Sequence, residues 1–131
     1  MLDSRLCAFE EGGMTSLPGQ RILIVEDSWH LGVALKSLLR SVDAEVVGPV
    51  ATSAEAERLI AERVPDVAIV DFNLRGGELA HDLIDKLNYL SVRVIVISGY
   101  ATLPLPPDKV AAVLQKPMVE AQLLAALQIT P

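Results

Sequence analysis

The sequence predicts an α/β domain built on a doubly wound, five-stranded parallel sheet with helices on both faces. Short apolar runs alternate along the chain with amphipathic segments, a pattern typical of parallel strands joined by crossover helices. Four of these runs end at or just before a charged or hydroxyl residue: residues 22–25, 67–70, 92–97 and 110–114. Because the carboxyl edge of an open parallel sheet is where ligands bind, one polar site is expected there.

Length, charge and cysteine content limit the function classes. The chain has 131 residues, the size of one domain, and a formal net charge of −6. This acidic balance argues against nucleic acid or an anionic membrane surface as the partner. No apolar run approaches the roughly 18 residues of a membrane span. The single cysteine, Cys7, forms no intramolecular disulfide, so a reducing cytoplasm is the expected location.

Residues 1–20 are expected to be a flexible leader, followed by one folded domain over residues 21–131. The leader mixes glycine, proline and scattered charges without any apolar period. It also lacks the continuous apolar core of a signal peptide, and Met14 is an alternative start. Secretion is therefore not expected.

Residues 31–42 carry apolar side chains at helical spacing and predict the first helix. Residues 44–50 predict the second strand, where Pro49 indicates a strand end or an edge position. Thr52 is expected to cap the second helix, because Glu55 follows three residues later and can complete a capping box.

Residues 79–90 predict a third helix. Three prolines between residues 99 and 109 forbid a regular helix over most of that segment, so a fourth helix must be short or irregular. Residues 119–127 predict the last helix. Its apolar character would also allow homodimer contacts through Ala121, Leu124, Ala125 and Leu127.

Five residues are expected to meet at the carboxyl edge of the sheet: Glu26, Asp27, Asp71, Ser98 and Lys116. Carboxylates gathered at one edge repel each other unless a cation is supplied, and Mg²⁺ prefers such hard oxygen ligands. A carboxylate beside this ion can attack a phosphoryl group and form an acyl phosphate, so Asp71 is the expected nucleophile. Lys116 and the Ser98 hydroxyl would stabilise the charge on the phosphoryl oxygens.

Each of these features also has an ordinary structural interpretation. An acidic pair after a strand often caps the next helix. Lys116 would simply end a strand if Pro117 began a helix. Trp29, in a first helical turn, would pack against its neighbours. His30 and His81 have no second ligand at helical spacing, so surface or packing roles are expected for them.

Taken together, the motifs resemble those of response-regulator receiver domains over about residues 21–128. They are Ile22-Leu23-Ile24-Val25-Glu26-Asp27, Val70-Asp71 with Leu74 and Gly76-Gly77, Ser98-Gly99-Tyr100, and Lys116-Pro117. The resemblance implies a flavodoxin-like fold with strand order 2-1-3-4-5, phosphorylation of Asp71 by a sensor histidine kinase, and a cis bond before Pro117. It also implies Mg²⁺ at Glu26, Asp27, Asp71 and the Asn73 backbone carbonyl.

The chain departs from many receivers at Val113, three positions before the lysine. There, many receivers carry an aromatic residue that swings inward on phosphorylation, and that switch cannot operate in this chain. The Ser98-Gly99-Tyr100 motif, the loop after Asp71 and the proline-rich link resemble instead an atypical subgroup of receivers, found as single domains in alphaproteobacteria. Of that subgroup's Phe-Ala-Thr-Gly-Gly/Tyr motif, the chain keeps the hydroxyl, the glycine and the tyrosine.

The expected function is that of a stand-alone receiver. It would take a phosphoryl group from a sensor histidine kinase or phosphotransfer protein and then change its binding to a downstream protein. Fifteen residues follow Lys116, enough for one helix, so no output domain is expected and the surface of the proline-rich link, fifth strand and last helix would carry the signal. Such a domain catalyses only its own phosphoryl transfer and slow autodephosphorylation, so it is not expected to be an enzyme.

Three alternatives remain open. They are a small-molecule phosphohydrolase with Asp71 as nucleophile, a phosphate sink in a phosphorelay, and a receiver that binds partners without phosphorylation. Asn73 argues against the first, because it stands where a second aspartate would be expected. The intact acidic pair, Asp71 and Lys116 argue against the last.

Overall fold

The computed structural model of the chain describes residues 19–74, 80–99, 107–117 and 120–128. Within them lie β1 (Arg21–Val25), β2 (Glu45–Val50), β3 (Val67–Asp71), β4 (Arg93–Ser98) and β5 (Ala112–Gln115). The helices are α2 (Trp29–Ser41), α3 (Ser53–Glu62), α4 (His81–Tyr89) and α5 (Glu120–Gln128), and a 3-10 helix, η2 (Pro107–Lys109), precedes β5. No helix of the described part has the length and apolar content that crossing a membrane requires.

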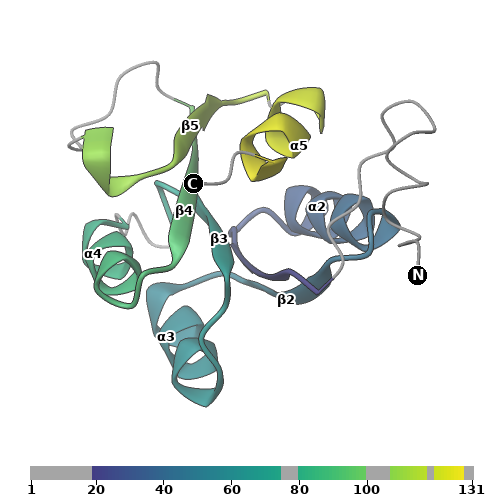
Figure 1. The fold of residues 1–131 in the computed structure, drawn as a ribbon. Helices are drawn as coiled ribbons and strands as arrows, with labels where there is room; N and C mark the ends of the chain where they lie inside the picture. Colours follow the sequence, from purple (N-terminus) through teal and green to yellow (C-terminus); the bar gives the residue numbers. More distant parts are fainter. Residues whose placement is uncertain (1–18, 75–79, 100–106, 118–119, 129–131) are drawn as a thin grey trace, which may run out of the picture.

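The strands form one parallel sheet in the order β2-β1-β3-β4-β5, which confirms the predicted fold class and strand order. Helices α2 and α5 cover one face of the sheet and α3 and α4 cover the other (Figure 1). Between β4 and β5 the described residues hold only η2, in agreement with a short or irregular fourth helix. The predicted leader lies outside the described residues except for its last two positions.

Alternating strand residues divide the core into two layers. Leu23, Val25, Ala68, Val70, Val94 and Val96 pack with α3 and α4. Ile22, Ile24, Val67, Ile69, Ile95 and Ile97 pack with α2 and α5. Burial on both faces explains why these strands are continuous apolar runs. Leu127 of α5 is part of the second layer and is fully buried, so the expected dimer contact through this side chain is wrong.

Side-chain caps begin two of the helices. The Ser28 hydroxyl accepts a hydrogen bond from the Leu31 N–H and caps α2. Thr52 caps α3 as predicted, accepting from the Glu55 N–H at 3.2 Å. Glu55 completes the predicted box, and its Oε1 also accepts from the Ala51 N–H at 3.1 Å. These contacts fix the loop between β2 and α3.

A bulge in the edge strand β2 directs this loop toward the carboxyl edge of the sheet. Leu23 pairs with Val47 and Val25 with Val50, so two residues of β2 lie opposite one residue of β1. The Val50 carbonyl then accepts the Glu26 N–H at 2.8 Å. The bulge therefore connects the end of β1 to the start of the β2–α3 loop.

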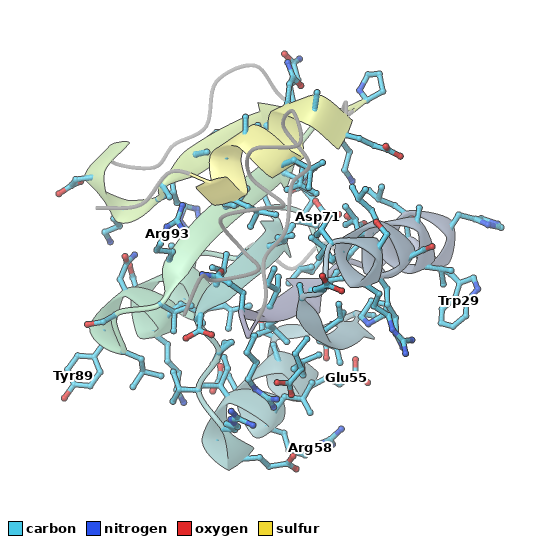
Figure 2. The ribbon with its side chains drawn as sticks, turned by 45° about the vertical axis from the view of Figure 1, so that its right-hand side comes forward. Trp29, Glu55, Arg58, Asp71, Tyr89 and Arg93 are labelled. Atoms are coloured by element: carbon cyan, nitrogen blue, oxygen red, sulfur yellow. The ribbon has the colours of Figure 1, made fainter. Side chains whose placement is uncertain are left out.

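Among the described residues, the two largest exposed apolar side chains are Trp29, 72% exposed at the start of α2, and Tyr89, 87% exposed at the end of α4 (Figure 2). The packing role expected for Trp29 is wrong, because the buried side of α2 is set by Gly32, Leu35 and Leu39. His30 is exposed, as expected. His81 packs edge to face on Phe72, with ring centroids 5.1 Å apart.

Strand β5 begins two residues later than the sequence predicts. Pairing with β4 starts at Ala112, opposite Ile95. Just before it, the Asn88 side chain donates a hydrogen bond to the Lys109 carbonyl at 2.8 Å, and the Lys109 ammonium lies 2.5 Å from the Asp85 carboxylate. These contacts hold η2 against α4, so the chain joins the sheet only after them.

The bulge in β2 provides a test of the packing. Gly48 has a φ of +94°, and a Cβ built there would lie 2.7 Å from the Ile24 carbonyl oxygen. Gly19 also has a positive φ, +79°, but a Cβ there would meet nothing within 4 Å. Gly19→Ala should cost about 1 kcal/mol of unfolding free energy, and Gly48→Ala about 1–3 kcal/mol more, because it adds a backbone clash to the same conformational strain. Urea unfolding of both variants measures the difference, and equal losses would contradict this account of the bulge.

Candidate functional site

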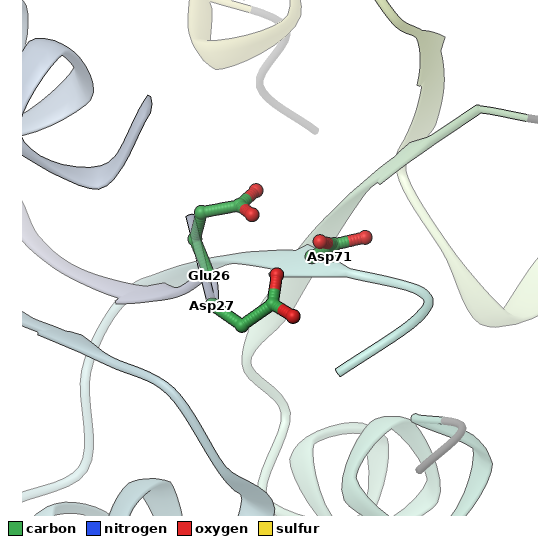
Figure 3. A group of neighbouring side chains, drawn as sticks. All are labelled: Glu26, Asp27 and Asp71. Carbon is green, nitrogen blue, oxygen red and sulfur yellow. The ribbon is translucent and has the colours of Figure 1, made fainter. Parts of the chain in front are cut away.

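Three carboxylates and one ammonium converge at the carboxyl edge of the sheet. Oxygens of Glu26, Asp27 and Asp71 all lie within 4.8 Å of one another (Figure 3). The Lys116 ammonium lies 3.1 Å from Asp71 Oδ2 and 3.7 Å from Glu26 Oε2. Residues that directly follow β1 and β5, together with the last residue of β3, thus form one cluster at the place where the sequence predicts a site.

The register of the sheet produces this convergence. Val25 pairs with Val70, so the residues that follow them, Glu26 and Asp71, are neighbours. Asp71 pairs with Ile97, which places Ser98 one position further along β4. Glu26, Asp71 and Ser98 are buried, at 4%, 3% and 0% exposed, whereas Asp27 is the more open member of the cluster. The site therefore has a buried floor and an accessible side.

Both oxygens of the Asp71 carboxylate have a donor. The Asn73 N–H donates to Oδ1 at 3.1 Å, and the Lys116 ammonium donates to Oδ2. The role expected for the Asn73 carbonyl as a metal ligand stays a prediction. The Ser28 N–H donates to the Glu26 carboxylate in the same way. These two main-chain hydrogen bonds were not predicted, because the pattern of side chains in a sequence does not show which main-chain N–H groups will donate to them.

A main-chain hydrogen bond to β4 fixes the position of Lys116. Its N–H donates to the Ser98 carbonyl at 2.7 Å, and the Lys116–Pro117 peptide is cis, as the resemblance implies. Burial lowers the pKa of the ammonium, but the hydrogen bond to Asp71 and the attraction of Glu26 outweigh it, so the pKa is raised. Ending a strand is therefore only part of what Lys116 does, since its charged group lies within the carboxylate cluster.

Glu26 is a buried acid of the site whose pKa is raised. Its Oε2 accepts the Ser28 N–H at 3.1 Å, and its buried Oε1 has no hydrogen-bond partner within the described part of the chain. Burial and the hydrogen bond with Asp71 raise the pKa of Glu26 from 4.5 to about 7, against the opposing effects of Ser28 and Lys116. The helix-capping interpretation of the acidic pair is wrong, because Ser28 provides the cap of α2.

The cluster fits a divalent cation by its chemistry. Within the described part of the chain, three carboxylates face one ammonium, and one buried carboxylate oxygen lacks a donor. A hard cation with oxygen ligands, such as Mg²⁺, would satisfy both the excess charge and the unpaired oxygen.

Two further expectations concern the neighbouring strands. Val113 of β5 is 43% exposed, so the position of the aromatic switch in many receivers holds a partly exposed aliphatic side chain. Gly76, Gly77 and Tyr100 lie outside the described residues.

The family model for the response regulator receiver domain matches residues 22–128. The chain belongs to the response-regulator receiver family. This match includes all the residues of the cluster and all five strands except Arg21, the first residue of β1. The resemblance to the atypical subgroup of receivers stays a prediction.

Solved receiver structures share the fold. A CheY-like receiver domain from Methylobacillus flagellatus is 25% identical with a TM-score of 0.73, over 84% of this chain and 97% of that one. The PhyR receiver domain of Erythrobacter litoralis is 24% identical with a TM-score of 0.72, over 84% and 88% of the two chains. PhyR from Brucella abortus is 23% identical with a TM-score of 0.77, over 95% of this receiver and 52% of the longer protein. The comparison with curated proteins finds no match.

The raised pKa of Glu26 predicts a pH dependence of stability in the metal-free receiver. Because the folded state holds this proton more tightly than the unfolded state, the stabilisation is full below pH 4.5 and is lost as the pH rises through about 7. Between about pH 5.5 and about pH 8 the wild type should therefore lose about 2 kcal/mol more than Glu26→Gln, which stays neutral. Urea unfolding in a chelator at both pH values measures this, and parallel losses in the two proteins would show that Glu26 ionises normally.

Proposed function

We propose that this receiver accepts a phosphoryl group on Asp71 from a phosphohistidine of a sensor kinase or phosphotransfer protein. The observation that carries the proposal is the Lys116 ammonium 3.1 Å from Asp71 Oδ2 within a group of three carboxylates, two of which are buried. A structural ion pair would need one acid, whereas this site gathers three around a single lysine. A metal ion would neutralise the excess negative charge of the three acids, and the ion and Lys116 together would stabilise the negative oxygens of a phosphoryl group.

The transfer is a substitution at phosphorus. A carboxylate oxygen of Asp71 attacks, the new O–P bond forms, and the N–P bond to the donor imidazole breaks. The bonding electrons go to the imidazole nitrogen, which takes a proton from water. Lys116, whose raised pKa keeps it charged, stabilises the negative phosphoryl oxygens, and the buried Ser98 hydroxyl would donate to one of them.

Glu26, Asp27 and Asp71 would hold Mg²⁺, with the Asn73 carbonyl as a further ligand. When bound, the ion supplies positive charge to the phosphoryl oxygens. Asp71 would serve both as ligand and as nucleophile. Its Oδ1, fixed by the Asn73 N–H, keeps the carboxylate in one orientation.

The output would be a changed affinity for a protein partner, with no turnover of external substrates. A groove of about 340 Å³ lies along β5 and α5 and is lined in part by Lys116, Val113 and Gln122. Lys116 belongs to both the groove and the site. Its movement on phosphorylation would therefore change the shape of the groove. A kinase-linked role and a single cysteine support a cytoplasmic location.

Phosphorylation of Asp71 is tested with acetyl phosphate and Mg²⁺. The wild type should gain one phosphoryl group, seen as a shift in a phosphate-affinity gel and in the intact mass, because Asp71 is the nucleophile. Asp71→Asn should gain none, while Asp82→Asn, at an exposed position of α4, should behave as wild type. Modification of Asp71→Asn to the wild-type extent would place the phosphoryl group elsewhere.

The same preparation separates the receiver from a phosphohydrolase. Sustained turnover of a chromogenic phosphate ester, lost in Asp71→Asn, would favour the hydrolase. A single modification without turnover would favour the receiver.

Binding of Mg²⁺ should stabilise the fold. At ten times its dissociation constant the ion should add about 1.4 kcal/mol and raise the Tm by several degrees, because it neutralises the carboxylates in the folded state only. Thermal unfolding with Mg²⁺, against NaCl of equal ionic strength, measures the shift. A double variant, Glu26→Gln with Asp27→Asn, should lose it, and an equal shift in that variant would argue against these ligands.

A further inference from the structure

A second pocket opens beside the carboxylate cluster, between the start of α2 and the β2–α3 loop. Its volume is about 170 Å³, and its lining includes Glu26, Asp27, Trp29, Pro49 and Glu55. At about 30 Å³ per water molecule this is space for roughly five or six waters, and it lies below the range of about 300–1,000 Å³ typical of small-molecule sites. The pocket therefore has the size of the end of one long side chain.

The charge of the pocket selects a cation. Among the described residues, the lining of the pocket includes three acids and no lysine or arginine. Glu55 stays ionised, because the hydrogen bond from the Ala51 N–H lowers its pKa. Glu26 lines the buried end of the pocket, and its carboxylate is shared with the cluster around Asp71. The nearby Arg58, one turn along α3, is exposed and does not line the pocket.

The indole ring of Trp29 favours an organic cation over a metal ion as the ligand of this pocket. The exposed Trp29 lies at the outer edge of the molecule, on the same side as Glu55 (Figure 2). A hydrated metal ion gains nothing from an indole ring, whereas a guanidinium stacks on it and donates hydrogen bonds to carboxylates. Val33, one turn further along α2, is 40% exposed, and a protein surface would cover it where a small cation would not.

We infer that this pocket receives an arginine side chain of the protein that donates the phosphoryl group, an inference that rests on the proposed role of Asp71. The pocket shares Glu26 and Asp27 with the phosphorylation site, so a protein bound there has its surface beside Asp71. The Glu55 carboxylate would pair with the guanidinium, and the indole of Trp29 would stack on it. They position the donor and take no part in the transfer itself.

Binding is tested with a blocked Ala-Arg-Ala peptide against its citrulline counterpart, which has the same shape without the charge. The chain contains one tryptophan, so Trp29 fluorescence reports the pocket directly, and chemical shifts of backbone amides locate the peptide. The arginine peptide should bind at millimolar concentration and the citrulline peptide more weakly. Glu55→Gln, which keeps the helix cap, should weaken arginine binding by about threefold to fivefold, as expected for one partly exposed ion pair.

Glu57→Gln is the matched control, because Glu57 lies on the same helix but pairs with Lys86 at 3.4 Å, outside the pocket. This variant should bind the peptide as the wild type does. An equal loss in both variants would mean a diffuse charge effect and would overturn the inference. Equal affinity for the arginine and citrulline peptides would overturn it as well.

The identity of the occupant is tested by transfer. Helical peptides that carry phosphohistidine with an arginine roughly one turn away serve as donors, beside their citrulline counterparts. The arginine donor should phosphorylate the wild type several-fold faster, and Glu55→Gln and Trp29→Ala should remove this advantage without changing the rate with acetyl phosphate. Equal rates from both donors would overturn the assignment to the phosphodonor. Failure of acetyl phosphate to modify Asp71 would instead overturn the proposed function.

Discussion

The site depends on an unbalanced group of charges held at the carboxyl edge of the sheet. Three carboxylates meet one ammonium, and two of the carboxylates are almost fully buried. Removing like charges from water is unfavourable unless they are neutralised, and in the metal-free chain the raised pKa of Glu26 provides the neutralisation by retaining a proton. A divalent cation would displace that proton. Binding of metal and ionisation of Glu26 are thus linked, and both occur beside the carboxylate that is proposed to accept the phosphoryl group.

Hydrogen bonds that involve the main chain hold the three carboxylates and Lys116 in place, although the carboxylates repel one another. The Glu26 N–H is held by the Val50 carbonyl, the Asp71 carboxylate by the Asn73 N–H, and the Lys116 N–H by the Ser98 carbonyl. Each contact joins the end of one strand to a neighbouring strand or to the loop that follows it. The charged side chains are therefore oriented by hydrogen bonds at the ends of the strands.

The sequence predicted the strands and the cluster because both follow from local pattern. Strands buried on both faces are apolar throughout, and the polar residues that end them meet at one edge. The start of β5 and the exposure of Trp29 were not predicted, because they depend on contacts between distant residues. The Asn88 side chain holds η2 and delays β5, and Pro49 of β2 sets the position of α2. No periodicity within one segment reports such contacts.

The same distant packing shapes the second pocket. A Cβ at Gly32 would lie 2.9 Å from the Pro49 ring, so only glycine lets α2 approach β2 this closely. Trp29 lies one turn before Gly32 on the helix, and the close approach brings it to the wall that Pro49 also lines. The β2 bulge places Pro49, and the capped loop after it places Glu55. Trp29 and Glu55, which would recognise a donor, are thus positioned by the packing of α2 and β2, while the reacting residues are positioned by the sheet register. The two groups of residues meet at Glu26 and Asp27, which belong to both the pocket and the cluster.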